Sequence, residues 1–266
     1  MKVVEVNRGT GPIVLGLPHA GTWLPDDIKT RLTPLGRKLT DTDWHIDRLY
    51  DGLRDDVTTV RATFHRYVID ANRDPSGASL YPGQNTTELV PLTDFDGKKL
   101  WRDPPDSIDV DVRRRQYHAR YHAALQTELN GALDRHGIAI LYDCHSIRSH
   151  IPHLFDGILP DFNIGTNNGE TCAAALEARV TATCRAAPEY STTVNGRFKG
   201  GWTTRHYGAP AKGIHAIQME LTQSTYLKAE KLPFAYDLDK ATRLRCTLTK
   251  ILSSLSETAT KLSAAA

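Results

Sequence analysis

Two histidines and one glutamate, residue types that bind metal ions or move protons, stand at the ends of apolar segments. His19 follows PIVLGLP, His145 follows IAILYDC, and Glu220 ends IHAIQME. If these segments are strands of one sheet, the three side chains converge at the sheet edge where α/β proteins form their sites. A catalytic zinc ion typically takes three protein nitrogen or oxygen ligands and one water molecule, so two histidines and one carboxylate suffice.

The carboxylate ligand is predicted within residues 41–53, DTDWHIDRLYDGL. Its apolar residues recur near helical spacing and its first residues favour an N-cap, which together predict a helix. Asp43 and Asp47 are four residues apart and would share one face of that helix. Either aspartate can supply the third ligand. His45 lies between them but would point in a different direction on a helix.

Apolar runs predict strands at 12–17, 57–63, 66–70, 138–143 and 214–220. Leucines and tyrosines at intervals of four predict a long helix over 108–135, and further helices are expected over 170–186 and at the C-terminal end. Alternating strands and helices predict an α/β fold in which a largely parallel or mixed sheet is flanked by helices. With no linker in the sequence, residues 1–266 are expected to form a single catalytic domain.

The segment 71–105 is rich in Gly, Pro, Asn and Asp and is predicted to be a long loop. A loop of that length in a compact domain is usually functional. The two histidines of the long helix, His118 and His122, have the spacing of a metal pair but lack the HExxH signature. We therefore interpret them as part of a packed or solvated helix face. Asp143, two residues before His145, could orient that histidine as a hydrogen-bond acceptor.

Composition narrows the functional class. The 33 basic residues are offset by 31 acidic ones, giving a net charge of +2 and no basic stripe for nucleic acid. No stretch approaches the ~20 apolar residues of a membrane span, and the N-terminal residues do not resemble a signal peptide. The four cysteines form no CxxC pair, which favours reduced thiols. A cytoplasmic enzyme with a small-molecule substrate is expected.

Six segments resemble, in order, the motifs of the N-formylglutamate amidohydrolases, a branch of the zinc-carboxypeptidase-like hydrolases with a phosphorylase/hydrolase-like fold. They are LPHAGTWLP, TDWHIDRLYD, RYVIDANRDPSG, YDCHSIRS, RFKGGWTTRHYGAP and HAIQMELTQSTYL. The resemblance spans nearly the whole chain. It implies zinc-dependent hydrolysis of N-formyl-L-glutamate to formate and L-glutamate, a reaction of histidine degradation.

The resemblance also implies a role for each residue around the metal. His19 and His145 look like the zinc histidines, and Asp47 is similar in position to the acidic ligand, with Asp43 as the competing choice. Glu220 resembles the general base that takes a proton from the attacking water and passes it to the leaving amine. Zinc-bound water has a pKa of roughly 7, so a neighbouring carboxylate can complete its deprotonation.

Arginines are implied as the substrate contacts. Arg66 is similar to an arginine that stabilises the oxyanion, and Asn72 with Arg73 resembles a pair that binds a substrate carboxylate. A dicarboxylate N-acyl amino acid needs a second cationic contact, for which Arg205 is the predicted residue, with Lys199 and Arg148 as the other basic candidates. The alternatives are a deacylase of another small N-acyl amino acid, of the aspartoacylase or succinylglutamate desuccinylase kind, and a catalytically silent metal-binding protein.

Overall fold

A computed structural model describes residues 2–79 and 86–264 of the chain. Seven strands form one sheet in the order β1-β3-β2-β4-β7-β5-β6. Their bounds are β1 Val4–Asn7, β2 Ile13–Leu17, β3 Thr58–Ala62, β4 Ala139–Ile147, β5 Phe162–Gly165, β6 Thr192–Val194 and β7 Ile214–Thr222. The four central strands β3, β2, β4 and β7 are parallel, whereas β1 and β5 pair antiparallel with their inner neighbours. The expected α/β fold with a largely parallel, mixed sheet is confirmed.

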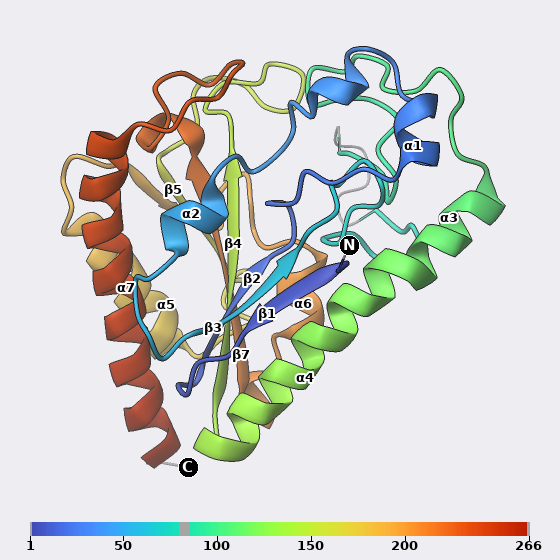
Figure 1. The fold of residues 1–266 in the computed structure, drawn as a ribbon. Coiled ribbons are helices and arrows are strands. Elements are labelled where there is room, and N and C mark those ends of the chain that lie inside the picture. The colour runs from blue at the N-terminus through green and yellow to red at the C-terminus, as the bar shows by residue number, and fades with distance from the viewer. Residues whose placement is uncertain (1, 80–85, 265–266) are drawn as a thin grey trace.

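Helices cover both faces of the sheet (Figure 1). One face packs against α2, α5 and α7, and the other against α4. The helix bounds are α1 Asp26–Arg31, α2 Ile46–Tyr50, α3 Ser107–Arg113, α4 Ala119–His136, α5 Ala174–Arg185, α6 Trp202–Tyr207 and α7 Leu238–Ala264. None of the described helices is long and apolar enough to cross a membrane.

Alternation along the central strands explains the two layers. On β2, Ile13 and Leu15 belong to the core under α7, whereas Val14 belongs to the core under α4. Successive side chains of a strand point to opposite faces, so an uninterrupted apolar run is the pattern of a strand that is covered on both sides. This is the reason that PIVLGL and IAILYD were recognisable as buried strands.

The long helix predicted over 108–135 exists as a nearly continuous rod. It begins as α3, whose first turn is capped by the Asp106 side chain accepting a hydrogen bond from the Asp109 amide. One wider, π-helical turn over Arg114–His118 joins it to α4. The rod ends at Gly137, which has a φ of 68°. A left-handed residue at that place is the usual end of a helix and is nearly free of strain for glycine.

Two local predictions are wrong. Residues 66–70 form a buried turn where a strand was predicted, because their backbone pairs with no neighbouring strand. Residues 41–53 contain only the five-residue helix α2, since His45 has a φ of 60° and reverses the chain immediately before Ile46. Asp43 therefore lies before the helix, and it does not share a helix face with Asp47.

Candidate metal centre and active site

The predicted convergence of strand ends occurs in the structure. β4 and β7 are in register with His145 opposite Glu220, and His19 lies two residues beyond the end of β2. All three side chains line one cavity at the carboxyl ends of the parallel strands. The sheet thus brings together residues that are about 75 to 200 positions apart in the sequence, as expected for a site on an open α/β sheet.

Three buried side chains form a metal-ligating group. The ligand atoms of His19, Asp43 and His145 lie within 4.8 Å of one another. Asp43 Oδ2 is 3.8 Å from His19 Nδ1 and 3.5 Å from His145 Nδ1. His19 Nδ1 is buried and has no hydrogen-bond partner among the described residues, which is costly for a polar atom unless another group binds it. Two imidazoles and one carboxylate are also the ligand set of a catalytic zinc site, so these residues fit a metal ion.

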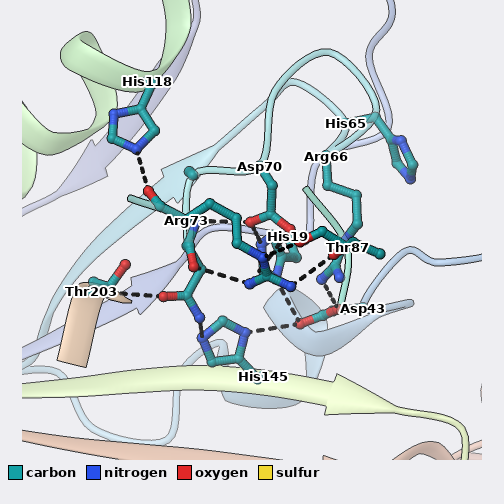
Figure 2. A network of polar contacts seen from close by, with 12 residues as sticks. His19, Asp43, His65, Arg66, Asp70, Arg73, Thr87, His118, His145 and Thr203 are labelled. Carbon is teal, nitrogen blue, oxygen red and sulfur yellow. Dashed lines mark hydrogen bonds and ion pairs between the residues drawn. The ribbon is translucent and has the colours of Figure 1, made fainter. Parts of the chain in front are cut away.

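A further carboxylate lies beside the outer nitrogen of each histidine, and Figure 2 shows Asp70 in this position beside His19. His19 Nε2 lies 2.7 Å from Asp70 Oδ1, and His145 Nε2 lies 3.1 Å from Asp143 Oδ2. The hydrogen bond to Asp70 places the proton of His19 on Nε2, which leaves the lone pair of its Nδ1 directed toward the centre of the group. Asp143 lies beside the His145 ring, and its role as the orienting acceptor stays a prediction.

Asp47 is not part of this group, and the prediction that it is the acidic ligand is corrected to Asp43. The Asp47 side chain is 39% exposed and lies 3.3 Å from Arg61, whereas the Asp43 side chain is 1% exposed. The reversal at His45 is the physical reason, because it sends the two aspartates to different sides of the segment. Helical spacing alone could not reveal this turn.

Arg66 fixes the charge of the acidic ligand. Its Nη2 donates to Asp43 Oδ1 at 2.9 Å, and the Ser146 amide donates to Asp43 Oδ2 at 3.0 Å. Burial opposes the charged form of Asp43, but the Arg66 guanidinium together with His145 and His19 outweighs it, so that the pKa of that carboxyl is lowered. Asp43 is therefore a carboxylate at neutral pH. Arg66 itself is buried and lines the cavity, as the predicted oxyanion contact requires.

The titrating groups of the site differ in their preferred charge. Burial, assisted by Arg66, lowers the pKa of His19 to about 4, so that this imidazole is neutral and able to bind a metal. Burial opposes the charged form of His145, yet Asp143 and Asp43 outweigh it and raise its pKa well above the usual value. Burial raises the pKa of Glu220 to about 8. A carboxyl whose pKa lies near neutrality is suited to both accept and return a proton.

The cavity has a volume of about 1060 Å³ including its open mouth, and arginine side chains stand on its wall. Arg73 is held in place because its Nε donates to Thr87 O at 2.9 Å and its Nη2 to Thr87 Oγ1 at 2.7 Å. Asn72 also lines the cavity, with its Nδ2 3.2 Å from His145 Nε2. The predicted substrate contacts Asn72 and Arg73 thus stand beside the metal group.

Arg205 is placed differently from its prediction. It lies on α6, its Nε donates to Gly200 O at 2.9 Å, and it is not among the described residues that line the cavity. Arg197 lines the cavity instead, with its Nε donating to Leu154 O at 3.3 Å. Arg197, eight residues before Arg205 in the same motif, is therefore the arginine of the two that lines the cavity, and the substrate contact of Arg205 stays a prediction.

Three residues of the site were missed by sequence reasoning, namely Asp70, Arg197 and Gln218. Gln218 could have been found, since it stands two residues before Glu220 on a strand and must face the same side. Asp70 gave no local signal, because its partner His19 is 51 residues away and the turn that presents it was read as a strand. Arg197 could not be distinguished by residue type from the other basic residues of the same segment.

Comparison with known proteins identifies the family of the chain. The family model described as N-formylglutamate amidohydrolase matches residues 11–227. N-formylglutamate deformylases of Pseudomonas putida and Pseudomonas aeruginosa are each 46% identical to the chain over 257 residues. The match covers 96% of this chain and 96% of each deformylase.

Solved structures show the same fold at lower identity. An N-formylglutamate amidohydrolase from Ralstonia eutropha superposes with a TM-score of 0.80 at 23% identity, covering 96% of this chain and 98% of the other. A gene product of Agrobacterium tumefaciens superposes with a TM-score of 0.73 at 17% identity, covering 97% of this chain and 96% of the other. With a family model that spans most of the chain and relatives at 46% identity, the chain belongs to the N-formylglutamate amidohydrolase family.

Proposed function

We propose that this protein hydrolyses the amide bond of N-formyl-L-glutamate and releases formate and L-glutamate. The observation that supports the proposal most strongly is the buried His19, Asp43 and His145 group beside Glu220, in a cavity that arginines line. The names of the 46% identical relatives support the same substrate. We further propose that residues 1–266 act as one catalytic domain in the cytoplasm, within histidine degradation. The described cysteines are all free thiols, which suits a reducing compartment.

Zinc is the proposed metal, held by His19, Asp43 and His145. When bound, it would supply an acidified water molecule and a positive charge for the amide oxygen. Asp70 and Asp143 then keep the two imidazoles in the orientation that faces the metal. The buried pair of Arg66 and Asp43 keeps the acidic ligand ionised.

Glu220 is proposed as the general base and acid. It takes one proton from the water that attacks the formyl carbon, and it returns that proton to the amide nitrogen as the bond between carbon and nitrogen breaks. The products, formate and L-glutamate, together contain the atoms of the substrate and of one water molecule. Arg66, buried and charged at the cavity wall, is proposed to stabilise the negative charge that develops on the amide oxygen.

Substrate carboxylates are proposed to bind on the arginine wall of the cavity. Arg73 with Asn72 is placed to bind one carboxylate close to the metal group, and Arg197 is the candidate for the other. A planar guanidinium gives two parallel hydrogen bonds to a carboxylate. Because the backbone oxygen of Leu154 and the Thr87 side chain and backbone already hold these arginines, little side-chain entropy is lost on binding.

The test is an assay of glutamate release from N-formyl-L-glutamate by zinc-loaded and chelated protein. N-acetyl-L-aspartate and N-succinyl-L-glutamate serve as comparison substrates for the related deacylases. We expect turnover of the formyl compound by the zinc-loaded protein, loss of turnover on chelation, and recovery on addition of zinc. Zinc-bound protein that hydrolyses none of the three compounds would refute the proposal and favour a silent binding protein.

A further inference from the structure

The segment that enters α6 fixes two amide side chains of the site at once. The Gly201 amide donates to Gln218 Oε1 at 2.7 Å, and the Thr203 amide donates to Asn72 Oδ1 at 2.9 Å. An amide side chain can adopt either of two flipped orientations, and the hydrogen bond to its oxygen decides between them. Because the side-chain oxygens of Gln218 and Asn72 accept hydrogen bonds from this segment, their NH₂ groups must point away from it.

The NH₂ group of Gln218 faces the proposed base. Gln218 Nε2 donates to Glu220 Oε2 at 3.1 Å, and both side chains are buried and line the cavity. The two residues are separated by one position on β7 and so lie on the same face of the strand. The result is a chain of hydrogen bonds from the Gly201 backbone through the Gln218 amide to one oxygen of Glu220.

This chain has a consequence for the reaction, and the inference rests on the proposed function. A carboxylate that shuttles a proton needs one oxygen facing the water and the leaving nitrogen, but the terminal torsion of glutamate is broad and leaves that direction poorly defined. We propose that Gln218 is a positioning residue that fixes Oε2 of Glu220, so that the other oxygen is presented to the substrate. Gly201, through its backbone amide, sets the orientation of Gln218.

The close packing at Gly201 supports this assignment. Its φ of −76° is open to any residue, so glycine is not needed there for backbone conformation. Space is the constraint, because a Cβ at position 201 would lie 2.4 Å from Asn72 Nδ2 and 2.6 Å from Asn72 Oδ1. The preceding residue is equally close to the sheet, since a Cβ on Gly165 would lie 2.5 Å from the Gly200 nitrogen. The backbone donors are thereby held at a fixed place relative to β7.

The test compares Gln218→Met with the wild-type protein, both loaded with zinc, using N-formyl-L-glutamate as substrate. The change removes the N–H donor to Glu220 and keeps a side chain of similar length. We expect kcat to fall about 10- to 100-fold with KM changed by less than about threefold and zinc content unchanged, the size typical of losing an orienting partner. Gln126→Met, at a glutamine on α4 whose amide donates to Asn130, is the matched control and should behave as wild type.

A double-mutant cycle separates positioning from a general structural effect. If Gln218 acts through Glu220, Gln218→Met should lower kcat of the wild type but leave the residual rate of Glu220→Gln unchanged. Equal factors in both backgrounds, or a Gln218→Met kcat within about twofold of wild type, would overturn the inference. Wild-type protein that is inactive on every substrate would instead refute the proposed function, and this inference with it.

Gly201→Ala provides an independent variant if the change at Gln218 prevents folding. We expect a loss of kcat in the same range, since the added methyl group must displace Asn72 or the segment that orients Gln218. Gly131→Ala is its control, because a Cβ there would meet only the end of the Arg135 side chain at 3.3 Å. A Gly201→Ala protein with wild-type kcat would show that the segment does not position the site.

Discussion

Among the described residues, two pairs of buried histidines have their rings in contact, and of these the pair His19 and His145 belongs to a metal-ligating group. The rings of His19 and His145 are 5.0 Å apart between centroids, and those of His118 and His122 are 4.3 Å apart. Sequence spacing favours the second pair, since its members are four residues apart on a helix, whereas the first pair is separated by more than 120 residues. Proximity and spacing therefore do not decide which histidines bind a metal.

The partners of the rings make the difference. His19 and His145 each have a carboxylate at Nε2 and share the Asp43 carboxylate at Nδ1. The described hydrogen bonds of the helical pair go to backbone carbonyls, at Arg73 for His118 and Ala71 for His122, and to the Tyr207 hydroxyl. A histidine bound to a metal can donate its other ring N–H to a carboxylate or to a backbone carbonyl, so the deciding difference is the Asp43 carboxylate that His19 and His145 share at Nδ1.

The helical pair, His118 and His122, nevertheless supports the strand-end pair, His19 and His145. By bonding the carbonyls of residues 71 and 73, it holds the backbone that presents Asn72 to His145. Figure 2 shows His118 contacting this backbone on the side opposite the metal group. The prediction of a packed helix face is therefore correct for these histidines. In addition, they support the backbone next to Asn72.

The largest expected contrast lies between matched substitutions of the two pairs. His145→Gln should lower zinc affinity by more than about 100-fold and abolish measurable turnover, because one of three ligands is lost. His122→Gln should keep zinc, since its amide can still donate to the Ala71 carbonyl. Metal content after dialysis against a weak chelator measures both. Retained zinc in His145→Gln would contradict the assignment of the ligands.

The next contrast separates the two aspartates of one segment. Asp43→Asn should weaken zinc binding about 10- to 100-fold or more, because it removes a ligand charge and leaves the buried Arg66 without its partner. Asp47→Asn should change zinc affinity and kcat by less than about twofold, as its half-exposed pair with Arg61 has little energy to lose. Equal losses in both variants would show that Asp43 does not have the special role given to it.

A smaller contrast concerns the two arginines of the loop before α6. Arg197→Gln should raise KM for N-formyl-L-glutamate about 10-fold or more, the value of one charged hydrogen bond, while N-formyl-L-glutamine should be affected much less. Arg205→Gln should change either KM by less than about threefold, because its guanidinium does not line the cavity. If Arg205→Gln has the larger effect on the charged substrate, the assignment of Arg197 is wrong.

The last contrast concerns the stability of the zinc-free protein at different pH values. The pKa of Glu220 is raised to about 8, so folding favours its protonated form, and this contribution is present below its unfolded pKa near 4.5 and is lost as pH rises through 8. Glu220→Gln should therefore unfold at a higher temperature than wild type at pH 8 to 9, with the difference shrinking toward pH 5. Thermal unfolding in the presence of chelator measures this, and a difference independent of pH would contradict the raised pKa.

The sequence predicted those parts of the site that depend on strand ends. His19, His145 and Glu220 could be placed together because uninterrupted apolar runs mark buried parallel strands, whose carboxyl ends share one edge. Asp43 and Asp70 could not be placed, since both lie in turns whose direction depends on single left-handed or irregular residues such as His45. Arg197 was missed because charge alone does not distinguish an arginine at a cavity wall from others in the same loop.

The most direct test of the account is zinc content and kcat of Glu220→Gln measured on the same preparation. Replacing the carboxylate by an amide removes the proton acceptor and leaves His19, Asp43 and His145 in place. We expect one zinc ion per chain, as in the wild type, with kcat for N-formyl-L-glutamate lowered by about 10²- to 10⁴-fold. A zinc-loaded Glu220→Gln protein that hydrolyses the substrate at the wild-type rate would contradict the proposed mechanism.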